Sequence, residues 1–335
     1  MKPITENIIE QSTIEILQSQ GWEYLPGLAI APGAEQAERE SFEQIILVDR
    51  LRKALATLNP DIPIDAREAA IQKIQHIHSP DLLHNNEEFH RLLIEKVKIP
   101  YQQGGYERSH EVALVDFGHP ENNQFLVINQ YTIVENNQTK RPDVLLFVNG
   151  IPMVVIELKN ATDENADIIS AFRQIQTYKA TIPGLFTFNS VCIISDGLEC
   201  KAGSVSADIS RYMAWKSADG IKDASRFSPQ LETLLKGMLQ PSVLLDLMRN
   251  FIVFEKTKKE DLKTRLIQIQ TEKKLTAYHQ YYAVNKAVQS TIKASGVNGD
   301  RLGGVVWHTQ GSGKSISMVF YSGKLITSRE MQILC

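Results

Sequence analysis

The sequence contains no apolar run that approaches the ~18 residues a membrane-spanning helix needs. Its first residues, MKPITENIIE, have no apolar core behind a basic cluster, so no export signal is expected. Cysteine is scarce, and Cys192, Cys200 and Cys335 give neither a disulfide framework nor zinc-ligand spacing. We therefore expect a cytoplasmic protein without a membrane anchor. A length of 335 residues favours two domains.

An overall excess of basic residues is also missing. The formal net charge of −3 gives no global electrostatic reason to bind nucleic acid. The charge is unevenly distributed, because residues 1–100 carry 10 Lys+Arg against 16 Asp+Glu, whereas residues 255–301 carry 10 against 5. A nucleic acid would have to meet such a local basic face. The basic stretch is equally compatible with a solvated helix face.

Hydrophobic periodicity predicts the order of the elements. Four helices are expected in the first hundred residues, at 3–20, 41–58, 65–77 and 86–98. The period then changes to two, which predicts strands at 112–117, 124–134, 143–148, 152–158 and 190–195. Asn149-Gly150 is a strong tight-turn signal between two of these strands. A helix at 164–180 between the last two predicts a parallel crossover.

The remainder of the chain is expected to be mostly helical. The pattern predicts helices at 229–252 and 255–293, a short strand at 303–308, and a helix from Ile316 to Leu325.

The most informative motif pairs two carboxylates. Arg141-Pro142-Asp143 precedes Glu157-Leu158-Lys159, and Asp143 lies fourteen residues before Glu157. Acids on neighbouring strands can converge on one Mg²⁺, which in phosphodiester hydrolysis acts as a Lewis acid and lowers the pKa of an attacking water. Because strand side chains alternate, Glu157 and Lys159 share one face. The Lys159 ammonium can then orient the water and offset phosphate charge.

Chance is a real alternative for this motif, because Glu and Lys two residues apart are common in strands. Its placement favours a function, since Glu157 ends the apolar run MVVIEL, where a lone buried carboxylate is costly. Taken alone, the motif leaves the nuclease interpretation and chance about equally open.

Two further segments offer side chains to the same site. Gln174 and Tyr178 form a Q-x-x-x-Y pattern on the helix that follows, and residues at i and i+4 share a helix face. The first helix offers Glu6 and Glu10, also at i and i+4, and one of them can add a metal-facing carboxylate. A polar or solvated helix face explains either pattern without a function.

A second motif predicts nucleotide binding. Gly311-Ser312-Gly313-Lys314-Ser315 follows an expected strand and opens an expected helix. Backbone amides of such a loop cradle phosphates at the helix N-terminus. Lys314 would reach the β- and γ-phosphates of ATP, and Ser315 the Mg²⁺. The strict pattern has Gly at the position of His308, a change that helicase-like motors tolerate.

An adenine-reading residue is expected upstream of this loop. Gln280, in the aromatic run Tyr278-His279-Gln280-Tyr281-Tyr282, can offer both a donor and an acceptor, although the run is equally typical of a helix core. No Asp-Glu motif follows within the twenty residues after Ser315. These residues alone are therefore expected to turn over almost no ATP.

Together these motifs resemble the restriction (R, or HsdR) subunit of type I restriction-modification enzymes, of which this chain looks like the amino-terminal part. The resemblance runs through nearly the whole length. It rests on TENIIEQSTIEILQSQGWEY, RPDVLLFVNGIPMVVIELK, AFRQIQTY, ISDG, YMAWKSADG, LLDLMRNFIVFE and VVWHTQGSGKSISMVF.

The resemblance implies an α/β fold, with a PD-(D/E)xK nuclease core followed by the start of a RecA-like P-loop motor. It implies an ATP-dependent endonuclease that cuts unmethylated foreign double-stranded DNA and works with methylation (M) and specificity (S) subunits. Asp143 and Glu157 match the metal ligands, Lys159 the catalytic lysine, and Gln174 and Tyr178 the flanking motif. Lys314 and Ser315 match the P-loop pair and Gln280 the adenine-reading glutamine, while Glu10 is favoured over Glu6 as the first-helix acid.

The predicted organisation is a nuclease domain at 1–225, a helical linker at 226–260 and part of a motor domain at 261–335. Two alternatives remain open. One is a helicase-nuclease of another defence or repair system, and the other is a DNA-binding assembly module without catalysis.

Overall fold

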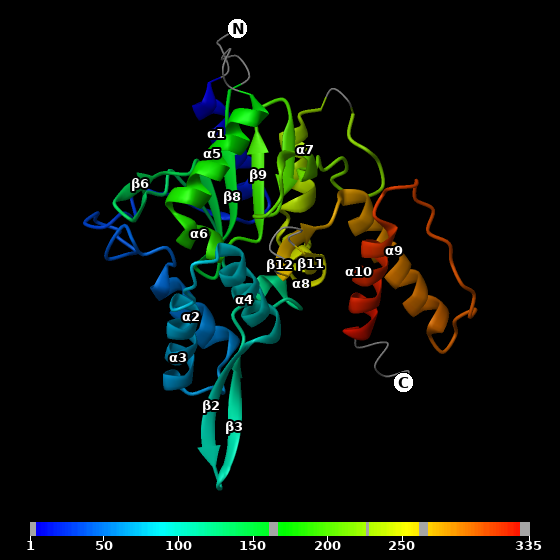
Figure 1. Ribbon diagram of the computed structural model, residues 1–335, viewed down its shortest axis with the longest axis horizontal. Helices are drawn as coiled ribbons and strands as arrows, with labels where there is room; N and C mark the ends of the chain where they lie inside the picture. Colours follow the sequence, from blue (N-terminus) through cyan, green and yellow to red (C-terminus); the bar gives the residue numbers. More distant parts are fainter. Residues whose placement is uncertain (1–4, 161–166, 226–227, 261–266, 329–335) are drawn as a thin grey trace.

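A six-stranded sheet lies at the centre of the computed structural model, which describes residues 5–160, 167–225, 228–260 and 267–328 (Figure 1). In spatial order its strands are β1 (Glu23–Pro26), β4 (Phe125–Asn129), β7 (Val144–Val148), β8 (Ile151–Leu158), β9 (Val191–Ser195) and β10 (Cys200–Gly203). The sheet is mixed, because β1 runs parallel to β4 and β8 parallel to β9, while the other neighbours are antiparallel.

The central strands β7, β8 and β9 are apolar because both of their faces are covered. Every residue of all three strands is buried. The predicted turn between β7 and β8 is confirmed, since Asn149 and Gly150 both have positive φ, at 52° and 81°. This geometry suits the twist of a two-residue hairpin.

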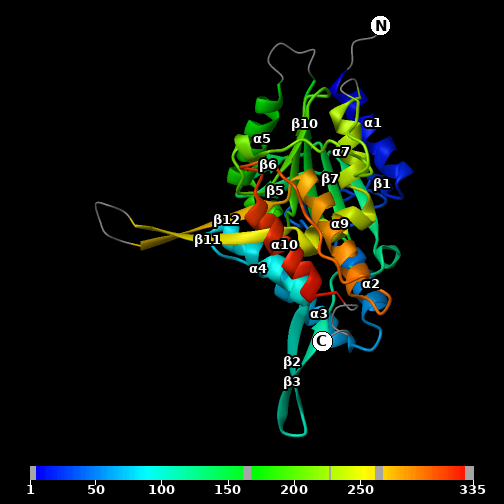
Figure 2. The ribbon, with the colours of Figure 1, turned by 90° about the vertical axis from the view of Figure 1, so that its right-hand side faces the viewer.

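Helices cover both faces of the sheet (Figure 2). One face packs against α5 (Ile168–Thr181) and α6 (Pro183–Thr187), and the other against α1 (Glu6–Ser19) and α7 (Gln230–Met238). Alternate strand residues separate accordingly, with Leu145 and Val155 in the core under α5, and Leu146 and Ile156 in the core under α1. The chain runs from β8 through α5 and α6 to the parallel strand β9, so the predicted crossover is confirmed.

A smaller helical layer lies between β1 and β4 in the sequence. It consists of α2 (Val48–Leu58), α3 (Ile64–Gln75) and α4 (Leu82–Glu95), followed by a protruding hairpin of β2 (Val97–Gln103) and β3 (Tyr106–Val112). Shorter elements lie elsewhere along the chain: η1 (Pro120–Asn122) directly before β4, the hairpin of β5 (Ile133–Glu135) and β6 (Gln138–Lys140) between β4 and β7, and η2 (Ile209–Arg211) after β10.

Three predicted boundaries in this region are wrong. The helix expected at 41–58 begins only at Val48. The strand expected at 112–117 is absent, because β3 ends at Val112 and the Asn59 side chain pairs with both backbone groups of Ala113 in place of a neighbouring strand. The strand expected at 124–134 stops at Asn129, because Gln130 adopts a positive φ of 52° that ends the extended backbone.

The segment 226–260, predicted to be a helical linker, contains two helices and a strand. The helices are α7 and α8 (Pro241–Asn250), and the strand is β11 (Ile252–Glu260). The helices also belong to the core that covers the sheet, since Leu234, Leu245 and Met248 are buried there and the Trp22 indole donates to the Leu239 carbonyl.

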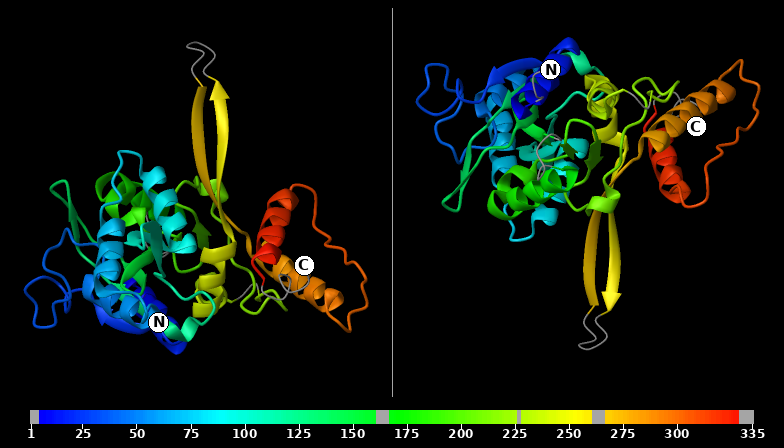
Figure 3. Two further views of the ribbon diagram at one scale, coloured as in Figure 1. Left: turned by 90° about the horizontal axis from the view of Figure 1, so that it is seen from below. Right: turned by 90° about the horizontal axis from the view of Figure 1, so that it is seen from above.

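The helix predicted at 255–293 is wrong in its first half. β11 pairs with β12 (Ile267–Leu275) in an antiparallel hairpin that projects from the body, and the helix α9 begins only at Tyr278 and ends at Ser295 (Figure 3). The basic residues suggested a helix face, whereas the alternation in IQIQ at 267–270 is typical of a strand.

The last described part holds α9 and α10 (Lys314–Ile326), which pack against each other. The strand expected at 303–308 is absent. Within the described residues no strand runs alongside this segment, and Val305 and Trp307 are almost fully exposed.

Candidate active site

Asp143 and Glu157 lie opposite each other on neighbouring strands. Val144 pairs with Ile156 in the antiparallel β7–β8 ladder, so Asp143, one residue before β7, continues the register opposite Glu157. Both side chains fall on the face covered by α5, because they alternate with Val144 and Ile156, which point to the other face. Asp143 is 6% and Glu157 1% exposed.

Lys159 completes this group at the end of β8. Its ammonium donates to Glu157 Oε1 at 2.6 Å and to the Leu158 carbonyl at 2.9 Å. Its backbone N–H is held by the Ser195 carbonyl at 2.8 Å, which extends the β8–β9 ladder by one residue. The predicted proximity of Glu157 and Lys159 on one face is therefore observed.

Burial dominates the electrostatics of both acids. It raises the pKa of Asp143 to about 6, although the Leu158 N–H, 2.8 Å from Oδ2, acts in the opposite direction. Burial, and then the charge of Asp143, raise the pKa of Glu157 to about 8. Burial opposes the charge of Lys159, but the neighbouring Glu157 outweighs it, so the pKa of Lys159 is raised. Two buried acids and one ammonium are thus mutually coupled.

α5 brings Tyr178 to the same place. Tyr178 is buried, its hydroxyl donates to the Arg141 carbonyl at 3.4 Å, and burial together with the charge of Glu157 raises its pKa. Gln174, one turn earlier and half-buried, interacts with the Tyr178 hydroxyl and partly offsets this rise. Tyr178 of the predicted Q-x-x-x-Y pair therefore lies beside Glu157, and Gln174 contacts the site through Tyr178.

The first helix contributes two acids of different character. Glu10 is 7% exposed, and its two oxygens accept from Asn129 Nδ2 at 2.7 Å and Gln130 Nε2 at 2.6 Å. Glu6 is half exposed and lies 3.9 Å from the Lys159 ammonium. Asn129 and Gln130 were missed by sequence reasoning, although an Asn-Gln pair that directly follows the apolar run FLVI is the signal that could have found them.

The donor set fits a hard divalent cation. Glu157 Oε2 is buried without a hydrogen-bond partner among the described residues, and carboxylate oxygens are the ligands that Mg²⁺ prefers. As they stand in the described residues, no three acid, His or Cys side chains converge closely enough to form a metal site. Protein donors occupy the other oxygens instead, with Lys159 on Glu157, the Leu158 N–H on Asp143, and two amides on Glu10.

The glycine loop stands before α10 as the sequence predicts. Gly311 and Gly313 have positive φ, at 82° and 76°, and Lys314 begins the helix. The Lys314 ammonium folds back onto its own loop and donates to the carbonyls of His308 and Thr309, at 3.3 and 3.0 Å. Ser312 lies in the loop, where its N–H donates to the Thr309 carbonyl at 3.3 Å, and Ser315 lies in the first turn of α10. The N-terminus of such a thirteen-residue helix is suited to an anion, because its first N–H groups have no partner within the helix.

Gln280 supports this loop. Its Nε2 donates to the carbonyls of Ser312 and Gly313 at 3.2 and 3.1 Å, and its Oε1 accepts from the Ala277 N–H at 2.9 Å. Both ends of the amide are therefore in use, and the side chain is 5% exposed. In this arrangement the amide positions the loop and α9, and it presents no open edge to a base.

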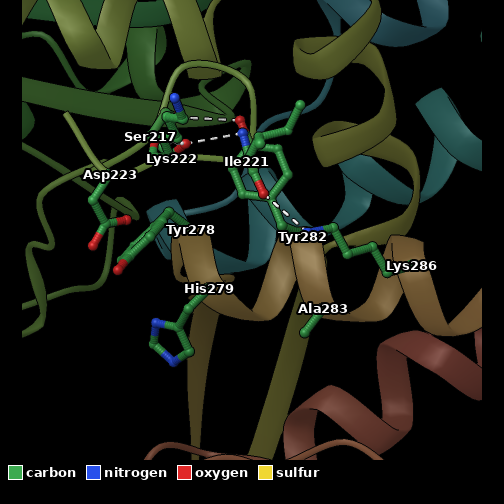
Figure 4. A pocket seen from close by; sticks show the side chains of 10 residues that line it. Ser217, Ile221, Lys222, Asp223, Tyr278, His279, Tyr282, Ala283 and Lys286 are labelled. Atoms are coloured by element: carbon green, nitrogen blue, oxygen red, sulfur yellow. Dashed lines mark hydrogen bonds between the residues drawn. The ribbon is translucent and has the colours of Figure 1, made fainter. Parts of the chain in front are cut away.

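A pocket of about 240 Å³ opens beside another face of α9 (Figure 4). Tyr278, Tyr282 and Lys286 lie one turn apart on that face, and the Tyr282 hydroxyl donates to the Ser217 carbonyl at 3.2 Å. None of the predicted site residues lines this pocket.

Comparison with known proteins places the chain in a family. The family model described as the N terminus of type I restriction enzyme R proteins matches residues 3–211. The chain belongs to this family. A model of the SWI2/SNF2 ATPase matches residues 279–334, which contain the glycine loop, α10 and all of α9 except its first residue.

Individual relatives agree with this assignment. The endonuclease subunit of the type I restriction enzyme HindI from Haemophilus influenzae is 43% identical over 332 residues, which is 98% of this chain and 31% of the relative. A relative from Methanocaldococcus jannaschii, named for the MjaIXP type I restriction enzyme, is 31% identical over 346 residues, covering 97% of this chain and 32% of the relative. The chain thus spans about a third of the length of these relatives. In the described residues, no helix has the length and apolarity to cross a membrane.

Proposed function

We propose that the chain supplies the magnesium-dependent endonuclease site, and part of the ATP-driven DNA translocase, of a type I restriction-modification enzyme. The substrate is unmethylated foreign double-stranded DNA, and the chain works in the cytoplasm with methylation and specificity subunits. The observation that carries the proposal is the group of Asp143, Glu157 and Lys159 at one end of the sheet, in a chain of the R protein family.

Each part of the site has a separate task in this proposal. Asp143, Glu157 and Glu10 would hold Mg²⁺, with Glu157 Oε2 as the acceptor that has no hydrogen-bond donor within the described part of the chain. A bound Mg²⁺ supplies Lewis-acid activation and a more acidic water. Lys159 sits on Glu157, where its ammonium can orient the attacking water and offset phosphate charge. Tyr178 and Gln174, both on α5, would flank the carboxylates on the side that α5 covers.

The fold proposed for residues 1–225 is the PD-(D/E)xK nuclease core. The mixed sheet, the β7–β8 hairpin that carries the acids and the covering helix α5 support it. Helices α7 and α8 join this core to residues 261–335, for which we propose the first part of a RecA-like motor. In that part the amides of Gly311–Ser315 would cradle the phosphates of ATP. Lys314 would turn from the carbonyls of His308 and Thr309 to the β- and γ-phosphates, and Ser315 would face Mg²⁺.

The test is DNA cleavage by the assembled restriction complex. Asp143→Ala, Glu157→Ala and Lys159→Ala should each reduce Mg²⁺-dependent cleavage of supercoiled plasmid by roughly 10²-fold or more. Lys159→Ala should still bind the metal. Glu15→Ala, an exposed acid on the same helix as Glu10, is the control and should cut normally. Cleavage at the normal rate by any of the three site variants would contradict the assignment.

A second measurement separates the type I system from other helicase-nucleases. Cleavage should require the specificity subunit and should disappear on plasmid methylated at the recognition site. Cutting that is independent of both would favour a helicase-nuclease of another defence or repair system. Absence of any metal-dependent cutting, with DNA binding retained, would favour a non-catalytic assembly module.

A further inference from the structure

Glu10 is a buried acid that comes from a helix on the opposite side of the sheet from α5. Its neighbours on α1, Ile9 and Ile14, belong to the core that α5 does not reach. A buried carboxylate is costly unless hydrogen bonds satisfy it. The chain meets this requirement at the end of β4, where two consecutive amide side chains each donate to one oxygen of Glu10.

The two amides are themselves fixed. The Tyr24 hydroxyl donates to Asn129 Oδ1 at 3.1 Å, which sets the amide so that Nδ2 faces Glu10. Gln130 has a φ of 52°, a conformation that costs a non-glycine residue energy, and its backbone N–H is held by the Asp143 carbonyl at 2.9 Å. Gln130 Nε2 also lies 3.5 Å from Asp143 Oδ1, so one amide stands between the two acids.

Gly27 supports this turn from outside. Its N–H donates to the Asn129 carbonyl at 3.0 Å, and a Cβ at this position would lie 2.4 Å from that same oxygen. The backbone at Gly27, directly after β1, therefore approaches the turn more closely than a residue with a side chain would allow. Hydrogen bonds hold the turn on both sides of the strained residue, from Tyr24 and Gly27 to Asn129 and from the Gln130 N–H to the Asp143 carbonyl.

We propose that Asn129 and Gln130 form an amide clamp that positions Glu10 beside Asp143 as a ligand of the metal site, a role that rests on the proposed nuclease function. Each carboxylate oxygen has two lone pairs, and the clamp uses one on each oxygen of Glu10, so both oxygens can still face a cation. Such hydrogen bonds orient ligating carboxylates, and their loss typically weakens metal binding by roughly 10–100-fold. Asn129 and Gln130 are positioning residues that act through Glu10.

The experiment measures Mn²⁺ binding by the 335-residue chain, with Mn²⁺ alone as the probe, by calorimetry and by the electron paramagnetic resonance signal of free Mn²⁺. Gln130→Gly removes the amide and suits the positive φ, so the fold should survive. Gln130→Asn is the second variant, because Asn also tolerates this φ but is one methylene shorter. Asn137→Gly, at an exposed turn with a φ of 60°, is the matched control. Thermal unfolding of each variant checks the fold.

Both Gln130 variants should weaken Mn²⁺ binding by roughly 10–100-fold, and Asn137→Gly should leave it unchanged. Glu10→Gln should weaken binding similarly, and adding Gln130→Gly to it should cause a much smaller loss than Gln130→Gly causes in the wild type, because the clamp acts mainly through Glu10. The clamp is overturned if Gln130→Gly weakens binding as much in the Glu10→Gln variant as in the wild type, or if folded Gln130 variants bind Mn²⁺ as tightly as the wild type or more tightly.

The proposed metal site itself is wrong if Asp143→Ala also fails to weaken binding, or if the wild-type chain binds no Mn²⁺. If Mn²⁺ binding is weakened by Asp143→Ala but not by the Gln130 variants, the metal site stands and only the clamp is wrong.

Discussion

Glu157 is a carboxyl group whose burial opposes its charge. It is 1% exposed, Lys159 occupies one oxygen, and the other oxygen has no hydrogen-bond partner among the described residues. Burial and the neighbouring Asp143 raise its pKa to about 8, from an ordinary value of 4.5. Without a metal, the ionised site therefore stores unfavourable energy, as is common where a fold is arranged for a ligand.

This conflict predicts how pH affects stability. The unfolded chain loses the Glu157 proton near pH 4.5 and the folded chain near pH 8, so between these values the folded state binds more protons. The contribution of Glu157 to the free energy of unfolding is therefore full below pH 4.5 and falls as pH rises to 8. As pH rises across that window, the free energy of unfolding of Glu157→Gln should increase relative to that of the wild type by roughly 1–3 kcal/mol.

Urea denaturation in EDTA at several pH values between 4.5 and 9 measures this difference. Glu15→Gln, an exposed acid, should follow the wild type throughout. A difference between wild type and Glu157→Gln that stays flat with pH would show that the carboxyl group titrates normally in the folded state.

The sequence could identify the acids but not the groups that hold them. Asp143, Glu157 and Lys159 are found from spacing and strand alternation, because those rules are local and the register of one hairpin brings them together. Asn129 and Gln130 depend on a positive φ at Gln130 and on the arrival of Glu10 from a distant helix. Neither follows from hydrophobic periodicity, which continued the strand through them.

At the scale of elements, α10 is joined to the preceding helices by a small polar network. The Lys324 ammonium donates to Asp246 Oδ1 and Oδ2 on α8, at 2.5 and 2.6 Å, and to Asn285 Oδ1 on α9 at 2.5 Å. Side chains of Lys324 and Asp246 are only about 20% exposed. The helix that starts at the glycine loop is thereby connected to a helix that covers the sheet.

Lys324→Met should loosen α10 specifically. Hydrogen bonds to charged groups contribute about 1.5–3 kcal/mol when buried, and partial exposure reduces this, so a local loss of ~1–2 kcal/mol is expected. Amide hydrogen exchange of α10 should then accelerate by about tenfold, while the strands β7 and β8 keep their protection. Lys293→Met, exposed on α9, is the control. Equal acceleration in the sheet would mean that the network supports the whole fold and not this one helix.

The incorrectly predicted elements share a physical cause. Residues 267–275 form a strand because β11 lies beside them, and residues 303–308 form none because no described strand does. Strand formation depends on a partner that sequence periodicity does not reveal. Helices such as α1, α3 and α5 bond internally, so their approximate positions followed from periodicity.

At the scale of the whole molecule, Lys273 connects the β11–β12 hairpin to the body under the sheet. It lies on β12, it is 3% exposed, and its ammonium donates to Asn86 Oδ1 at 2.9 Å and to the Asn189 carbonyl at 2.6 Å. Asn86 in turn donates to the carbonyls of Phe186, Thr187 and Asn189. Three residues after Lys273 the chain leaves the hairpin for α9, which carries Gln280 and the contact to the glycine loop.

This buried ammonium gives stability a pH dependence of the opposite sign to that of Glu157. Burial lowers the pKa of Lys273 from 10.5 to about 7. The unfolded chain therefore binds more protons than the folded chain between pH 7 and 10.5, and the free energy of unfolding rises with pH across that window. Lys273→Met removes the titrating group and with it this rise. The free energy of unfolding of the wild type should therefore increase relative to that of the variant as pH increases from 7 to 10. Chemical denaturation at several pH values tests this, with the neighbouring, more exposed Lys274→Met as control.

Because Lys273 lies between the body and α9, Lys273→Met should also increase amide hydrogen exchange in α9 and at the glycine loop. Exchange that changes only in the hairpin would show that Lys273 stabilises β12 without connecting the two parts of the chain.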